Sequence, residues 1–211
     1  MKKIMFNDKY GLTQAVLEGR KTMTRRVISY PSKFRGQNVA GYYVCRKPSG
    51  ELVEVCLHDE DERMIDAGQI FPNFQVGEVV AIAQSYKDSG YTPDSLDRHP
   101  KDLSIRGLMK DSAGWNNKMF VKSYACKHHI KITNIKVERL QEISDDDCLK
   151  EGIFEWNAGQ KDIPFYSFSY ADIPDYFSPR DAFADLIDKV SGKGAWESNP
   201  FVFAYEFVLV D

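Results

Sequence analysis

The amino-acid sequence predicts an α+β protein in which a small, mostly antiparallel sheet curls into a barrel, with short helices at its rim. Three observations favour this class. Runs rich in β-branched and aromatic residues recur along the chain and end at glycine, proline or serine turns. Only three short segments combine a helix cap with an apolar stripe. One long β-rich segment, residues 129–140, changes the phase of its apolar positions, as a strand does where it bends around a barrel.

The strands are predicted from alternating apolar residues and from the turns between them. Residues 39–58 are expected to form a hairpin around the turn "PSG", and residues 76–86 a strand entered through a glycine turn. Other strands are predicted at residues 2–6, 118–125, 129–140 and 199–210.

The strand at residues 129–140 is expected to contain a β-bulge. Its apolar residues occupy even positions up to Ile132 and odd positions from Ile135 onward. Because side chains alternate between the two faces of a strand, one extra residue near Thr133 and Asn134 would keep both sets on the same face.

Three short helices are expected, each between a polar cap and a stop signal. Asn7 or Asp8 precedes the first, which Gly19 ends because glycine adopts the left-handed conformation at little cost. The other two begin at the serine caps Ser144 and Ser178. These later helical segments are residues 143–152 and 178–190.

Length and composition predict a single domain over residues 1–211. The chain is 43% hydrophobic and 28% charged, which are ordinary values for a folded protein. The polar or irregular stretches read as insertions at about residues 30–75, 88–117 and 154–177. The net charge of -3 means that a nucleic-acid partner would have to meet a local basic patch.

The sequence predicts a soluble, cytoplasmic protein that needs no metal or other cofactor. It has neither an apolar run long enough to cross a bilayer nor the apolar core of a signal peptide. Its four cysteines form no CxxC pair, so we expect reduced thiols. The motif "CKHH" (residues 126–129) resembles half of a zinc site, but two further ligands are missing nearby in the sequence.

The stretch "GRKTMTRR" (residues 19–26) is the most unusual feature of the chain. Four cationic side chains surround two threonines directly after the predicted end of a helix. A solvated basic loop is the ordinary interpretation of such a run. The alternative is a site in which Lys21, with its pKa lowered by burial or by neighbouring cations, activates the hydroxyl of a nearby threonine. Arg25 and Arg26 would supply that positive field or clamp an anion.

Glu151 is the second candidate site residue. It lies in the last turn of the predicted helix at residues 143–152, where the negative end of the helix dipole disfavours an acid. An exposed glutamate would tolerate this position at a small cost. A functional role requires Glu151 to point at the basic stretch.

The stretch also matches the G-x-K-x-x-T-x-R signature of the ASCH family, relatives of the PUA domains, through Gly19, Lys21, Thr24 and Arg26. Three further segments resemble the family in the same order along the chain. Gln84, in the first of them, stands where members of this layout often have a glutamate. The segments are "FQVGEVVAIAQSY", "IKVERLQEISDDDCLKEGI" and "GAWESNPFVFAYEFVLV".

This resemblance implies a PUA-like barrel with a basic cleft that binds RNA or a modified, cytidine-like nucleoside or nucleotide. Some small family members are amidohydrolases that deacylate N4-acetylcytidine, and their catalytic groups correspond to Lys21, Thr24 and Glu151. The ligand is then expected to contact the rest of the stretch, at Gly19, Arg20, Thr22, Arg25 and Arg26. Three functions stay open: a binding module, an amidohydrolase, and a phage-type accessory protein without catalysis.

Overall fold

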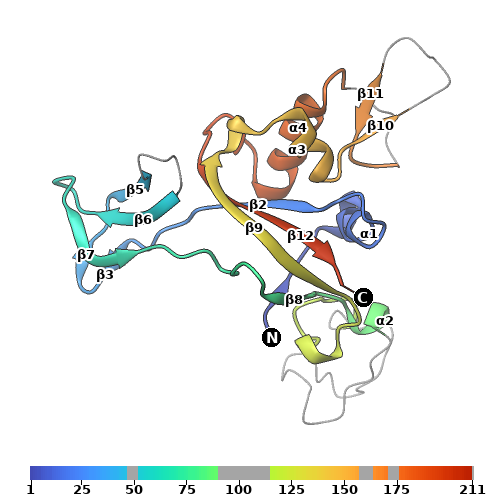
Figure 1. Cartoon of the computed structure of the whole chain (residues 1–211), viewed down its shortest axis with the longest axis horizontal. Coiled ribbons are helices and arrows are strands. Elements are labelled where there is room, and N and C mark those ends of the chain that lie inside the picture. Colours follow the sequence, from blue (N-terminus) through green and yellow to red (C-terminus); the bar gives the residue numbers. More distant parts are fainter. Residues whose placement is uncertain (47–51, 90–114, 157–163, 171–175, 211) are drawn as a thin grey trace.

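A computed structural model describes residues 1–46, 52–89, 115–156, 164–170 and 176–210. Its centre is a five-stranded sheet in the order β1-β8-β9-β12-β2 (Figure 1). All neighbouring pairs are antiparallel except the parallel pair of β1 and β8. The strands are β1 (Lys3–Ile4), β2 (Met23–Val27), β8 (Val79–Ile82), β9 (His129–Arg139) and β12 (Phe201–Leu209). The predicted α+β class with a mostly antiparallel sheet is confirmed.

The central sheet is open along its two edges. Closure into a barrel would require the edge strands β1 and β2 to pair, and within the described residues they do not. Burial is greatest in the middle of the sheet, where Val80, Ile130 and Val202 are fully buried. None of the helices in the described parts of the chain is long and apolar enough to cross a membrane.

The β-bulge predicted near Thr133 is confirmed. Glu206 of β12 pairs with Asn134 of β9, but the next residue, Phe207, pairs with Ile132. Thr133 is therefore the extra residue of β9, and its insertion explains the change of phase in the sequence. Ile132 and Val137, which occupy positions of opposite parity, are both buried.

The predicted helix caps are found where the sequence places them. Ser144 accepts a hydrogen bond from the backbone N–H of Asp147, at the start of α3 (Asp145–Lys150). Ser178 does the same for Asp181, at the start of α4 (Pro179–Ser191). The first helix differs from the prediction because Asn7 caps only a 3-10 turn, η1 (Asp8–Tyr10), before α1 (Leu12–Leu17) begins.

The strand predicted at residues 118–125 is wrong. This segment forms turns and a 3-10 helix, η2 (Ser123–Ala125). The ammonium of Lys3 donates hydrogen bonds to three backbone carbonyls of this segment, those of Lys118, Met119 and Val121, at 3.2, 3.1 and 2.6 Å. In a strand, successive carbonyls point in opposite directions. The carbonyls of this segment converge on one cation instead, so its backbone turns and does not extend as a strand. The short helix α2 (Tyr86–Ser89) precedes it in the chain.

A second sheet accounts for most of the first predicted insertion. It contains β5 (Gly41–Arg46), β6 (Leu52–His58) and β7 (Met64–Gln69), and stands apart from α3 and α4 (Figure 1). The predicted hairpin strands at residues 39–58 are confirmed, and their turn lies outside the described residues. β7 was not predicted. A separate small hairpin joins β3 (Lys33–Phe34) and β4 (Gln37–Asn38).

The third predicted insertion is more regular than its sequence indicated. β10 (Phe154–Trp156) pairs in antiparallel fashion with β11 (Phe165–Ser167). Most of the second predicted insertion, residues 88–117, lies outside the described residues. A last 3-10 turn, η3 (Leu140–Glu142), connects β9 to α3.

Gly152 at the end of α3 provides a test of the local packing. Its φ of +101° disfavours any side chain, and an added Cβ would lie 3.4 Å from the Cβ of Lys21. Gly77 has a φ of +86° but nothing within 4 Å. We expect Gly77→Ala to cost about 1–2 kcal/mol of unfolding free energy through backbone strain alone. Gly152→Ala should cost more because of the added contact. Urea unfolding measures both, and equal losses would show that the contact is unimportant.

Candidate functional site

The basic stretch connects α1 and α3 to the edge strand β2. Gly19 turns the chain with a φ of +74°, and the Lys21 amide then donates to the Ala15 carbonyl at 2.9 Å. The Thr22 amide donates to the carbonyl of Lys150, the last residue of α3, at 2.8 Å. The end of α3 is thereby held beside the start of β2, which brings together Lys21 and Glu151, 130 positions apart in the sequence.

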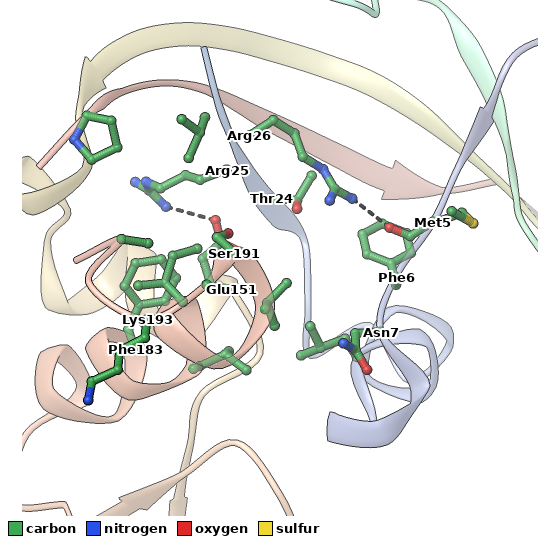
Figure 2. Close-up of a pocket in the computed structure, with 18 of the residues that line it drawn as sticks. Met5, Phe6, Asn7, Thr24, Arg25, Arg26, Glu151, Phe183, Ser191 and Lys193 are labelled. Atoms are coloured by element: carbon green, nitrogen blue, oxygen red, sulfur yellow. Dashed lines mark hydrogen bonds and ion pairs between the residues drawn. The ribbon is translucent and has the colours of Figure 1, made fainter. Parts of the chain in front are cut away.

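A cavity of about 560 Å³ lies between β2, the N-terminal segment and the end of α4 (Figure 2). All three residues with an expected catalytic role line it, namely Lys21, Thr24 and Glu151. Two of the expected ligand-binding residues, Arg25 and Arg26, line it as well. The structure therefore brings five of the eight candidate residues into one cavity.

Lys21 and Glu151 form a buried ion pair at the base of this cavity. The Lys21 ammonium donates to Glu151 Oε2 at 2.5 Å and to the Glu151 carbonyl at 2.7 Å. Their side chains are 2% and 5% exposed. The carbonyl is one of the unsatisfied groups at the end of α3, so the lysine satisfies the helix terminus and the carboxylate together. This explains why an acid is tolerated at the negative end of a helix.

Arg25 connects Glu151 to two further carboxylates and is completely buried. Its Nη1 donates to Glu151 Oε1 at 3.1 Å, and its Nη2 donates to Glu138 at 2.5 Å and to Asp147 at 3.0 Å. Lys136 donates to the same Asp147 oxygen at 2.6 Å. The Arg25 guanidinium thus binds protein carboxylates and fixes the position of the Glu151 carboxylate.

Burial and neighbouring charges shift the pKa values of Lys21 and Arg25 in opposite directions. Burial lowers the pKa of Lys21 and outweighs the stabilising charge of Glu151, and the positive charges of Arg26 and Arg25 lower it further. Burial also opposes the charge of Arg25, but Glu151 and Glu138 outweigh it and raise the pKa of Arg25. Of these groups, Lys21 is therefore the one whose proton is easiest to remove.

Thr24 and Arg26 present unused hydrogen-bonding capacity to the cavity. Thr24 is 5% exposed, and its hydroxyl has no hydrogen-bond partner among the described residues. Arg26 donates from Nη2 to the Met5 carbonyl at 2.6 Å and forms no ion pair with a carboxylate of the described chain. Burial lowers the pKa of Arg26. Thr24 lies between the Arg25–Glu151 and Arg26–Met5 interactions (Figure 2).

The rest of the cavity wall is largely apolar. Phe6 from the N-terminal segment and Phe183 from α4 are both buried and contribute ring surface. Sequence reasoning missed the end of α4 and the turn that follows it, where Ser191 and Lys193 line the cavity. The glycine on each side of Lys193 was the available signal, since it marks a turn directly after a helix.

The other three candidates lie outside the cavity wall. Gly19 serves as the turn described above, and Thr22 is half-buried beside α3. Arg20 forms an ion pair with Glu18 at 2.6 Å and contacts the rings of Phe154 and Tyr170. The three cations that were expected to contact the ligand are therefore divided: Arg26 faces the cavity, Arg25 belongs to the buried charge network, and Arg20 lies on a separate surface.

No metal centre is evident in the described parts of the chain. They hold no group of three or more His, Cys, Asp or Glu side chains that could bind an ion. All four cysteines are unpaired, and Cys126 of the "CKHH" motif packs in a small apolar cluster with Ala81, Tyr86 and Val121.

Comparisons of this chain with models of protein families, with curated proteins and with solved structures found no match.

Removal of Arg25 tests the buried charge network. Arg25→Met leaves Glu138, Asp147 and Glu151 without their shared cation, and we expect a loss of about 3–5 kcal/mol in unfolding free energy. The matched control is Arg63→Met, which breaks an exposed pair with Asp61 and should cost less than about 1 kcal/mol. Urea denaturation compares the two, and a loss at Arg25 as small as that at Arg63 would contradict the role of the network.

Acid should weaken the same network through Asp147. Burial alone would raise the pKa of Asp147, but Lys136 and Arg25 outweigh burial and hold the pKa below its ordinary value. The folded pKa is thus below the unfolded value of about 3.9. Its stabilising contribution is complete above that value and is lost as pH falls through the folded pKa. Urea unfolding between pH 3 and 7 should show a steeper acid loss for wild type than for Asp147→Asn; parallel curves would argue against this group.

Proposed function

We propose that the cavity binds a cytidine-like nucleoside, alone or as part of RNA, and that the chain is an ASCH-type domain related to PUA-like folds. The observation that carries this proposal is the convergence of Lys21, Thr24, Arg26 and Glu151 in one cavity. These four come from the signature stretch and from a helix end 130 residues away. A solvated basic loop would not bury Lys21 to 2% exposure.

The polar groups of the cavity complement the edge of a cytosine base. Cytosine presents an exocyclic amine donor beside two acceptors, N3 and O2. Glu151 is the acceptor that suits the amine, while Lys21 and Arg26 are donors that suit the two acceptors. The Thr24 hydroxyl can donate or accept, so it adapts to an unmodified or an acylated amine.

Size and wall chemistry also suit a nucleoside. The cavity volume of about 560 Å³ falls within the range of about 300–1,000 Å³ that is usual for small-molecule sites. The rings of Phe6 and Phe183 offer apolar surface to a flat heterocycle. Ligand pockets with few polar groups on an apolar wall commonly gain orientation from those groups and affinity from the wall.

Thr24→Val tests nucleoside binding without disturbing the charge network. The substitution keeps the shape and removes a hydroxyl that has no partner within the described residues, so stability should change little. Loss of one hydrogen bond predicts about five- to tenfold weaker binding of N4-acetylcytidine. Thr22→Val, on the same stretch but outside the cavity wall, is the control. Isothermal titration calorimetry measures both, and equal affinities of the two variants would argue against the cavity.

Hydrolysis of an N4-acyl group is a second candidate function, favoured by the unpartnered Thr24 hydroxyl beside the Lys21–Glu151 pair. In this mechanism Thr24 Oγ attacks the acyl carbonyl, and neutral Lys21 accepts the hydroxyl proton. Glu151, 2.5 Å from the Lys21 ammonium, relays this proton from Lys21 to the departing cytosine amine. Water then cleaves the acyl-threonine ester, which releases the acid and returns the hydroxyl of Thr24. The lowered pKa of Lys21 supports the first of these steps.

The rate of cytidine release from N4-acetylcytidine tests this second candidate. The rate should climb with pH through the Lys21 titration, with a midpoint below the ordinary lysine value because burial lowers that pKa. Lys21→Met should abolish release, whereas Lys189→Met, at an exposed pair with Asp185 on α4, should not. Release that survives Lys21→Met would assign the chemistry elsewhere. Binding without any release would favour the binding module.

A further inference from the structure

The hairpin of β10 and β11 carries an aromatic patch on one of its faces. Phe154 and Trp156 are two positions apart on β10, and Trp156 pairs with Phe165 of β11. All three side chains therefore lie on the same face of the hairpin. Tyr170 stacks on Phe154 with ring centres 4.3 Å apart, and Phe177 lies 5.3 Å from Phe165. We call these five residues the aromatic platform.

Two rings of the platform are open to solvent, and the other three, those of Phe154, Trp156 and Phe165, are half-buried. Tyr170 is 63% exposed and Phe177 is 68% exposed. Rings that fasten a loop to a domain are buried by the contact, and these two are not. A group of exposed aromatic side chains on one surface marks an interaction site.

Positive charge lies directly beside the platform. The Arg20 guanidinium is 5.2 Å from the ring centre of Tyr170 and 5.5 Å from that of Phe154. A hollow of about 260 Å³ continues past Tyr170, where Lys9 and Tyr10 also line the wall. Glu18, which holds Arg20 in place, is the acid in this hollow.

We propose that the aromatic platform and Arg20 form a second binding surface, separate from the cavity, for single-stranded nucleic acid. Exposed rings stack on bases of any sequence, and neighbouring cations contact the phosphates. The choice of nucleic acid over a protein partner rests on the proposed nucleoside function of the cavity. The surface accounts for Arg20, which belongs to the signature stretch but does not line the cavity.

Fluorescence anisotropy with a labelled single-stranded RNA of twelve nucleotides tests the surface. Loss of one stacked base predicts about tenfold weaker binding for Tyr170→Ala. Tyr170→Phe keeps the ring and should bind as wild type does. Phe71→Ala removes a ring that is 71% exposed at another place, and it should leave affinity unchanged. The affinity of the wild-type protein for this RNA should weaken as the salt concentration rises, and Arg20→Ala should reduce that salt dependence.

Two outcomes would overturn the surface. One is RNA affinity in Tyr170→Ala equal to that of wild type, including the case in which wild type binds no RNA at low salt. The other is a wild-type protein that light scattering shows to be a dimer and that Tyr170→Ala converts to a monomer without changing its affinity for RNA. This result would make the platform a protein interface. Calorimetry with N4-acetylcytidine tests the cavity separately. RNA binding that depends on Tyr170 would support the surface even if the nucleoside did not bind.

Discussion

The buried ionic contact between Lys21 and Glu151 is the constraint on which the site depends. It joins the turn after α1 to the end of α3, and Arg25 holds the other carboxylate oxygen from β2. Breaking a buried ion pair costs several kcal/mol because it leaves an uncompensated charge. The turn after α1, the end of α3 and β2 are therefore held together. The contact also turns two unfavourable features, a buried lysine and an acid at a helix C-terminus, into one satisfied arrangement.

The charge network divides the cations of the basic stretch (residues 19–26) by role. Arg25 binds three carboxylates and Lys21 is paired with Glu151, while Arg26 and the Thr24 hydroxyl form no ion pair or carboxylate contact among the described residues and face the cavity. Ligand pockets of this kind take their specificity from a few precisely placed polar groups on an apolar wall. Arg20 points to a different surface, so one short stretch contributes to the cavity, to its support and to the aromatic platform.

The sequence predicted best what local interactions decide. Serine caps at Ser144 and Ser178 and the bulge at Thr133 depend on near neighbours or on alternation, and each is found as expected. Residues 118–125 look β-rich, but the distant ammonium of Lys3 draws their carbonyls into a turn. In the site, the stretch itself was recognisable from its residue types. The sequence did not reveal that Arg25 binds three carboxylates or that Lys193 lines the cavity. Both depend on which helix ends meet β2.

A crystal structure of the protein soaked with N4-acetylcytidine would show whether the cavity binds this nucleoside. We expect density for the base in the cavity between Phe6 and Phe183, with the N4 substituent beside Thr24 and Glu151 and with the Lys21–Glu151 contact retained. The contradictory result is an empty cavity at saturating ligand, or a nucleoside bound elsewhere on the protein.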